Sequence, residues 1–418
     1  TNIRYVKKSV TRPSTSQAVI NIEDPDSDYE ILAWFDTASG TIYYYSDAEK
    51  IELNKDSSFM LHNFSALREI DMQNFDGKNI ENMRDFFSNC SNLASVNFSG
   101  FNTAKVTDMT GMFYANFVLK NLDLSSFDTS NVVYMNDMFS GMRELVNLNL
   151  SSFNTSKVEI MVNMFYDVRK IKNLNVSNFN TRSVKKMRNM FANMLELESL
   201  DISNFDTSKV EDMAYMFSQD HKIKTLNLSN LNTSRVTTME HMFQNMWALE
   251  SLDVSSFDTS NVTDMNNMFG GLAKITMLNL NNFNTSKVTN MSNMINSMLV
   301  IENLSLPSFD TRNVTTMNGM FGGMEGLKNL NITSFNTSSV RDFRYMFGLG
   351  TVPVYDHNLV DHLEHIYVSK KFVISAMETG GSEGIFYRRP SLTVGAGCTY
   401  VSGTGNPFCI SSTWVVVP

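Results

Sequence analysis

Hydrophobic residues recur along residues 75–347 of this chain with a period of 26 residues. Each of eleven consecutive units carries a phenylalanine, counted here as position 0, except that Leu231 takes its place once. Position 5 is always Val or Ile, positions 8 and 11 are each Met in ten units, and position 12 is Phe in ten. A fixed period of roughly 20–50 residues is typical of solenoids, in which each repeat packs only against its neighbours. The phenylalanines at position 0 are Phe75, Phe101, Phe127, Phe153, Phe179, Phe205, Phe257, Phe283, Phe309 and Phe335.

The spacing inside one unit predicts a strand, a turn and a helix. Positions 5, 8, 11, 12 and 15 are mostly three or four residues apart, as on the buried face of an amphipathic helix. Positions 18, 21 and 23 carry Leu, Ile or Val, and the last two alternate with polar residues as in a short strand with one buried face. Between them, Asp or Asn followed by Thr favours a turn and can cap the helix. The expected fold is therefore an α/β solenoid of the leucine-rich-repeat type, with a parallel sheet on one side and helices on the other.

The two ends of the chain depart from the period. Residues 1–28 are polar and are expected to be an arm or linker. Residues 29–58 hold two apolar runs around Ser39-Gly40, which predicts a β-hairpin capping the first repeat. The solenoid is expected over residues 59–350, followed over residues 351–418 by a degenerate last repeat and a β-rich C-terminal cap. In that last part, Ile385-Phe386 resembles a position 11–12 pair.

Composition narrows the possible partners. The net charge of the 418 residues is −9 and no basic run occurs, which argues against nucleic acid or an anionic membrane as the main partner. No stretch of about 18 apolar residues is present, so no membrane span is expected. The chain begins at Thr1 without a signal peptide, so we expect a processed chain whose targeting segment has been removed.

Methionine is unusually abundant, and 25 of the 29 residues fall at positions 8, 11 and 15. Methionine can form promiscuous binding surfaces, bind soft metals or fill a core. Strict periodicity favours the core, because a binding surface would vary from unit to unit.

Candidate chemistry is sparse. Cys398 and Cys409 could form a disulfide or be two separate buried thiols, whereas Cys90 at position 15 is interpreted as a core residue. His357, His362 and His365 lie among acidic residues and could bind zinc, but a polar connection into a strand is the favoured interpretation. No nucleotide-binding, metalloprotease or nucleophile-elbow motif occurs. We therefore expect no catalytic residues and no cofactor.

The amino-acid sequence of the repeat resembles that of a known family. The run from Phe257 to Phe269, FDTSNVTDMNNMF followed by LxxLxL, resembles the BspA-like leucine-rich repeat family of bacterial surface proteins, including its mycoplasma-type branch. The resemblance extends over about residues 30–400 and recurs eleven times. It implies an extracellular, secreted or surface-displayed bacterial protein that mediates adhesion or ligand binding without catalysis. The family often has Cys at position 15, here only Cys90, and no LPxTG-type sorting signal or lipoprotein cysteine is seen, so the resemblance does not extend to a mode of attachment.

Binding specificity is expected where the repeats differ, at positions 6, 7, 10, 13, 16 and 17. Irregular apolar or aromatic residues at these positions could form a partner site. The alternative is that position 16 is half-buried beside the end of the helix. His221 and Tyr166 lie in similar positions. The candidate binding residues are Tyr114, Phe117, Tyr134, Leu195, Tyr215, His241, Trp247 and Leu299.

Position 22 is a further polar position, with Asn or Asp in most units, and we interpret it as a ladder that stabilises the sheet rather than as a carbohydrate site.

Two functions remain open. The first is adhesion to, or binding of, a protein or glycan of a host or neighbouring cell. The second is a structural subunit of a surface filament, pilus or surface layer that self-associates through its terminal segments, such as Trp414–Val417. An enzyme would rest on the histidine cluster alone.

Overall fold

The structure is a computed structural model that describes residues 2–14, 18–25, 27–349, 361–373, 376–389 and 414–417. The chain divides into two compact units. The first comprises Thr1–Val184 with Asn193–Leu197, and the second comprises Lys185–Ala192 with Glu198–Pro418. Histidine 357 and the cysteines at 398 and 409 fall outside the described residues.

The N-terminal sheet of the first unit has the order β2-β3-β4-β1-β6-β8. The hairpin expected within residues 29–58 is formed by β3 (Leu32–Asp36) and β4 (Thr41–Tyr45), which pair antiparallel. Strand β1 (Tyr5–Lys8) lies between β4 and β6 (Glu69–Asp71) and runs parallel to both. Part of the predicted arm is thus a sheet strand, and β1, not the hairpin, covers the strand edge of the first repeat. Strand β2 (Ile20–Asn21) pairs with the outer side of β3.

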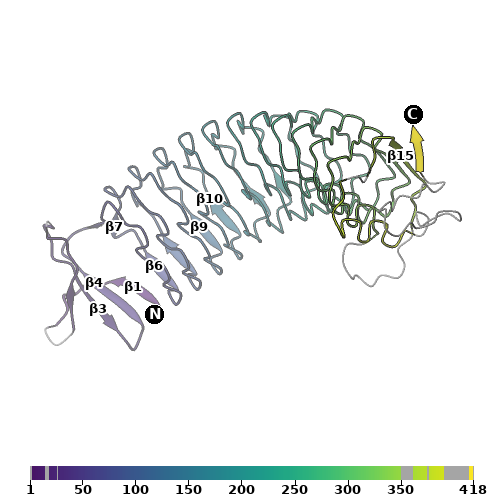
Figure 1. The fold of residues 1–418 in the computed structure, drawn as a ribbon. Helices are drawn as coiled ribbons and strands as arrows, with labels where there is room; N and C mark the ends of the chain where they lie inside the picture. The colour runs from purple at the N-terminus through teal and green to yellow at the C-terminus, as the bar shows by residue number, and fades with distance from the viewer. Residues whose placement is uncertain are drawn as a thin grey trace. The chain divides into compact units, whose positions relative to one another are not determined.

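Successive coils of the first unit stack with a step of 26 residues, one coil being one turn of the solenoid. Strands β9 (Asn121–Asp123) and β10 (Asn147–Asn149) are parallel, with Leu122 opposite Leu148. Figure 1 shows β6, β9 and β10 following one another along the same side of the coils. Strand β8 (Ser95–Asn97) pairs with β6, and β11 (Asn173–Leu174) is the last of these strands in this unit. The repeated parallel strands confirm a solenoid.

The first coil begins earlier than expected. Strand β5 (Ile51–Glu52) pairs in parallel with β7 (Phe75–Asp76). Strand β5 holds positions 2–3 of the first coil, and β7 holds positions 0–1 of the next coil. A parallel bridge joins Asp56 to Asn82, both at position 7. The solenoid therefore starts at Ile51 rather than at residue 59, within the range assigned to the hairpin cap.

The predicted helices are wrong, because the described residues contain none. In their place lies a run of tight turns that bonds to the neighbouring coil. The amide of Met109 donates to the carbonyl of Tyr134 at 3.0 Å, that of Gly111 to Asn136 at 2.9 Å, and that of Phe113 to Met138 at 2.9 Å. Of the amides between them, that of Met112 bonds three residues back, to the carbonyl of Met109 at 3.3 Å, and that of Thr110 bonds two residues back, to Asp108 Oδ1 at 2.8 Å. An α-helix would instead bond each amide four residues back within the same segment.

Tight turns and a helix give the same inward spacing, which explains the error. Turns of three residues also bring every third or fourth side chain to one side. Two features distinguish them. Positions 10 and 14 have positive φ, as at Asp137 (58°) and Asp167 (61°), which interrupts a right-handed helix. Backbone hydrogen bonds also join neighbouring coils, as from Phe113 to Met138 at 2.9 Å, whereas helices packed with their axes about 8–10 Å apart form no backbone hydrogen bonds with each other.

The second unit repeats this architecture with fewer strands. Strand β12 (Ser199–Leu200) is followed by a parallel sheet of β13 (Asn303–Ser305), β14 (Asn329–Asn331), β15 (His365–Ser369) and β16 (Trp414–Val417). The segments 225–227, 251–253 and 277–279, which include position 21 of their repeats, are described but are not strands. There the coils are still joined by parallel bridges at position 7, from Lys186 to Asp342.

The last described coil ends this stack. The amide of Phe347 donates to Ile385 at 2.9 Å, so Ile385 and Phe386 occupy positions 11 and 12, as predicted. The ring of Phe386 stacks on that of Phe347 at 5.7 Å. At position 15, where other coils often have Met, the buried Arg389 forms an ion pair with Asp361 and donates to the carbonyl of Met324.

The core confirms the interpretation of the methionines. Every Met at position 8, 11 or 15 of the eleven units is buried, as are the phenylalanines at position 12. The rings at position 12 of neighbouring coils stack on one another in both compact units, such as Phe139 on Phe165 at 5.5 Å and Phe217 on Phe243 at 5.8 Å. The predicted turn also forms, since Asp128 Oδ1 accepts the amide of Ser130 at 2.9 Å. The conspicuous residues of the repeat are therefore scaffold.

Candidate binding surface

The first unit holds four of the eight candidate residues, and they do not form a cluster. Tyr114, Phe117 and Tyr134 are exposed, and no ring contact joins these three described residues. The guanidinium of Arg143 lies 5.0 Å from the centre of the Phe117 ring and pairs with the buried Asp167 at 2.8 Å. The remaining candidate, Leu195, is half-buried. These residues therefore offer exposed or half-buried apolar surface without ring contacts among Tyr114, Phe117 and Tyr134.

The second unit brings aromatic residues of adjacent coils into contact. The rings of Tyr215 and His241, both at position 10, are stacked 4.3 Å apart and nearly parallel. Both residues have positive φ, 59° and 56°, so the left-handed turn that replaces the helix directs the two side chains alike. The rings of His221 and Trp247, both at position 16, are stacked 3.8 Å apart.

Two glutamines link these pairs. Gln244 Oε1 lies 2.9 Å from His241 Nδ1 and accepts a hydrogen bond from Ser218 Oγ at 3.3 Å. Gln219 Oε1 lies 3.1 Å from His221 Nε2, and the amide of Gln219 donates to the carbonyl of Gln244 at 2.8 Å. Tyr215, His221, His241 and Trp247, with Gln219 and Gln244, thus form one continuous surface across two coils, called the aromatic patch below.

Charge is balanced at the edge of the patch. The guanidinium of Arg188 lies 5.7 Å from the centre of the Tyr215 ring. It forms ion pairs with Asp212 at 3.0 Å and with Glu240 at 2.8 Å. Its positive charge is therefore already matched by two carboxylates, and the patch itself is not a strong site for an anion.

Two rings of the patch, those of His221 and Tyr215, are uncharged near neutral pH. Burial lowers the pKa of His221 below 6.5, which keeps its imidazole neutral. Burial, followed by the nearby Glu240, raises the pKa of Tyr215, which keeps its phenol protonated. The patch therefore offers flat apolar faces together with neutral hydrogen-bonding groups. Such a surface can stack against a planar or ring-shaped group and bond to uncharged polar atoms.

The most accessible ring is that of Trp247, whose side chain is 48% exposed. His221 covers one face of its indole. In the next coil, position 16 is Ala273, whose methyl group is too short to cover the opposite face. Leu299, the remaining candidate at this position, is exposed two coils away. Trp247 therefore presents an open aromatic face.

Sequence reasoning placed Tyr215, His241 and Trp247 among the candidates and noted His221 in a similar position, but it did not include the two glutamines. His221 holds position 16 in the unit before Trp247, so the period alone contained the signal for that stack. The linking role of Gln219 and Gln244 depends on the turn geometry, which the expected helix did not supply.

The other candidate residues that the structure describes form hydrogen bonds within the chain. His362 Nδ1 lies 3.1 Å from the carbonyl of Glu325, and His365 Nδ1 lies 3.2 Å from Asn329 Oδ1. No group of three or more potential metal ligands was found within the described residues. The Cys90 thiol is buried and lies 3.0 Å from the carbonyl of Leu61, and burial raises its pKa to about 12.

The polar ladder at position 22 is confirmed in the first unit. Asn97 Nδ2 donates to Asp71 Oδ1 at 3.1 Å, and Asn149 Nδ2 donates to Asp123 Oδ1 at 2.9 Å. These amides link neighbouring strands on the outer face of the sheet.

Among the residues that the structure describes, no helix is long and apolar enough to cross a bilayer.

Comparison with known proteins identifies the repeat. The model of a family described as "Mycoplasma protein of unknown function, DUF285" matches three times, over residues 55–174, 161–277 and 272–359. No curated protein matches the chain. The matched residues cover most of the chain and nearly all of the stacked coils. The chain therefore belongs to the DUF285 family.

Proposed function

We propose that this chain is a non-enzymatic extracellular protein that binds a partner, a protein or a glycan of another cell, through the aromatic patch. The supporting observation is the open indole face of Trp247, backed by His221 and continuous with the Tyr215–His241 stack. Exposed aromatic clusters on an otherwise regular surface are typical of interaction sites. The extracellular location rests on the resemblance of the repeat to BspA-like surface proteins.

A binding role also accounts for where the irregular residues lie. The repeated Met, Phe, Leu and Thr side chains are used in the core, so selection for a partner can act only on the variable surface positions. Tyr215, His241, His221 and Trp247 occupy two of those positions in adjacent coils. Their ring-stacked arrangement suits a ligand with flat apolar faces and hydroxyl or amide groups.

The test is binding of the purified chain to arrays of host glycans and of extracellular matrix proteins. Trp247→Ala should abolish the specific signal while leaving the unfolding curve near that of the parent. Trp34→Ala, in the hairpin of the first unit, is the matched control and should bind as the parent does. Equal binding by Trp247→Ala and the parent would exclude the patch as the site.

A second function is favoured by one observation at the C-terminal end. Among the described residues, strand β16 is the outermost strand in the order β13-β14-β15-β16, so its outer edge could pair with a strand of another copy. The chain would then be a subunit of a surface filament or layer. Electron microscopy of the protein at micromolar concentration tests this function, and polymers that disappear when residues 414–418 are deleted would support it over adhesion.

A further inference from the structure

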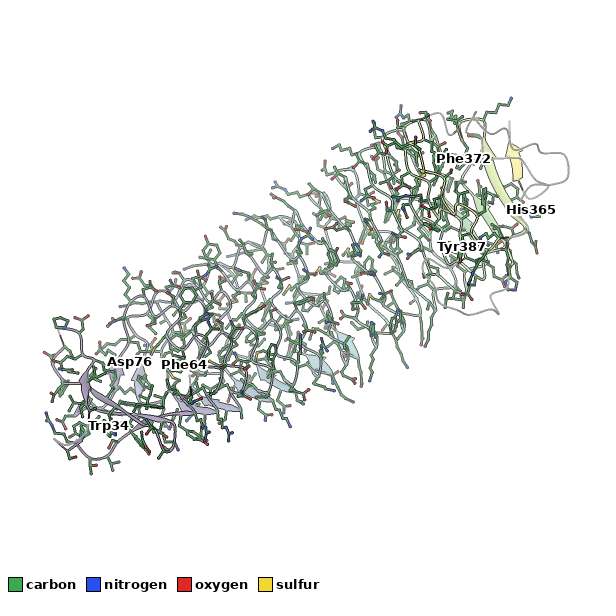
Figure 2. The ribbon with its side chains drawn as sticks, turned by 60° about the horizontal axis from the view of Figure 1, so that its bottom comes forward. Trp34, Phe64, Asp76, His365, Phe372 and Tyr387 are labelled. Carbon is green, nitrogen blue, oxygen red and sulfur yellow. The ribbon has the colours of Figure 1, made fainter. Side chains whose placement is uncertain are left out.

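The open end of the first coil borders a hollow of about 1530 Å³ in the first unit. It lies between the N-terminal sheet, which contributes Ile42 and Tyr44, and the first coil, which contributes Met60 and Phe64. Figure 2 labels Phe64 and Asp76, which line it, and Trp34 on the hairpin. Small-molecule pockets typically enclose about 300–1,000 Å³, so this hollow has room for a longer ligand.

The apolar part of the hollow is formed at a repeat position that is buried in later coils, where a preceding coil covers it. Met60 is at position 11 of the first coil and is 38% exposed, whereas Met112, at the same position two coils later, is fully buried. The difference arises because each later coil is covered by the one before it. On the strand side, β1 takes the place of a preceding coil. On the turn side the described residues provide no such cover for Met60.

The backbone of the first coil has the same open edge. In later coils, the carbonyls at positions 7, 9, 11 and 13 accept amides of the preceding coil, as Asn82 accepts from Ser57 at 3.0 Å and Arg84 accepts from Phe59 at 2.9 Å. The equivalent carbonyls of Asp56, Ser58 and Met60 accept no backbone amide from any described residue. They form a row of acceptors spaced two residues apart. An extended chain has amides at that spacing and can add to such a row.

Charge favours a cationic occupant. Eight carboxylates and three lysines line the hollow. One lysine, Lys55, is already paired with Glu81 at 3.0 Å, and the ammonium of Lys50 donates to the carbonyl of Gly100 at 2.9 Å. Asp28 and Glu49 have no ion pair with any residue that the structure describes. The hollow therefore has an unbalanced negative charge beside an apolar floor.

From the open carbonyl row, the uncovered Met60 and the excess of carboxylates, we propose that the hollow binds an extended peptide segment with alternating basic and apolar side chains. Its amides would bond to the carbonyls of Asp56, Ser58 and Met60. Its apolar side chains would cover Met60 and Phe64, and its basic side chains would face the carboxylates. This site is separate in sequence and in chemistry from the aromatic patch.

The probe is a fluorescein-labelled octapeptide of alternating lysine and leucine, titrated with the full chain at low salt and followed by fluorescence anisotropy. We expect saturable one-to-one binding that weakens as salt is added. The alternating glutamate–leucine octapeptide should not bind. A lysine–leucine peptide with N-methyl groups on every second amide should bind at least about tenfold more weakly, because it cannot donate to the carbonyl row.

Matched variants locate the site. The pair Asp28→Asn and Glu49→Gln should weaken binding about fivefold, while the distant exposed pair Glu144→Gln and Glu250→Gln should leave it unchanged. Met60→Gln should weaken binding about threefold. Met277→Gln, at a methionine that is 77% exposed, is the control and should have no effect.

Three results would overturn the proposal. Equal binding of the glutamate–leucine peptide would remove the role of charge. Unchanged binding of the N-methylated peptide would remove the backbone ladder. A concentration-dependent dimer in sedimentation experiments that excludes the peptide would make a second copy of the chain the occupant of the hollow.

Discussion

The hydroxyl of Thr129 binds both backbone groups of Asn154 in the next coil. Thr129 Oγ1 accepts the Asn154 amide at 2.8 Å and donates to the Asn154 carbonyl at 3.0 Å. The same pair of bonds joins Thr155 to Asn180. Because these hydroxyls are fully buried, each threonine at position 2 joins two coils at a point where neither the strands nor the turns do so.

Thr129→Val tests this link. Valine keeps the shape of threonine but removes both part-buried hydrogen bonds to the backbone of Asn154, so we expect the free energy of unfolding to fall by about 1–3 kcal/mol. Urea denaturation followed by circular dichroism measures it. The control is Thr107→Val, because the Thr107 hydroxyl is exposed and makes a single bond, to the carbonyl of Glu81 at 3.1 Å. Equal effects of the two substitutions would show that the double bond to Asn154 contributes nothing.

The turns at positive φ lead to a second prediction, about which of two substitutions is more stable. Turns and helices predict opposite orders of stability. Asn293 is at position 10 with φ of 55°. At positive φ glycine is favoured over alanine, so Asn293→Gly should be more stable than Asn293→Ala by about 1 kcal/mol. In a helix the order would be reversed by a similar amount. Thermal unfolding of the two variants decides between the geometries, and a more stable alanine variant would contradict the turns described above.

The period, the core and the parallel strands could be predicted from the sequence because each depends on which side chains face inward. The helices could not be separated from turns on that basis. The distinguishing signal was present at positions 10 and 14, where Asn, Asp and Gly are frequent and tolerate positive φ. Strand β1 was not predictable from its four residues, because its place depends on pairing with Thr41–Tyr44 and with Glu69–Ile70 far along the chain.

The candidate site was predictable residue by residue but not as a surface. Tyr215 and Trp247 are conspicuous because they interrupt a regular pattern. Their connection runs through Gln219 and Gln244, which are ordinary in a sequence; each side chain bonds to a histidine of one ring pair, and a backbone hydrogen bond joins the two glutamines. The hollow at the first coil had no such signal, since it arises where the preceding coil is missing.

Burial of the Cys90 thiol predicts that it is unreactive in the folded chain. Its pKa is raised to about 12 by burial, so the thiolate that reacts with electrophiles is not formed at ordinary pH. In a chain with Cys398→Ser and Cys409→Ser, iodoacetamide should modify Cys90 only in denaturant. Its rate of modification should rise with urea over the same range as the unfolding signal. Rapid modification of the native chain would show that the first coils open locally.

The stack of His221 on Trp247 predicts a dependence of stability on pH. Burial lowers the pKa of His221 in the folded chain below 6.5, so the unfolded chain takes up a proton first as the pH falls. The contribution is therefore complete above about pH 6.5 and is lost as the pH falls through the lowered pKa of the folded state.

We expect the NMR titration of the His221 ring protons to have its midpoint below 6.5. The free energy of unfolding should fall more steeply below that pH in the parent than in His221→Gln, whose side chain does not titrate. Binding through the aromatic patch should weaken over the same range, because a charged imidazole must be hydrated and the stack that supports the indole face is then disfavoured. A titration midpoint at or above 6.5, or identical pH profiles for the parent and His221→Gln, would contradict a neutral, half-buried His221 as the support of Trp247.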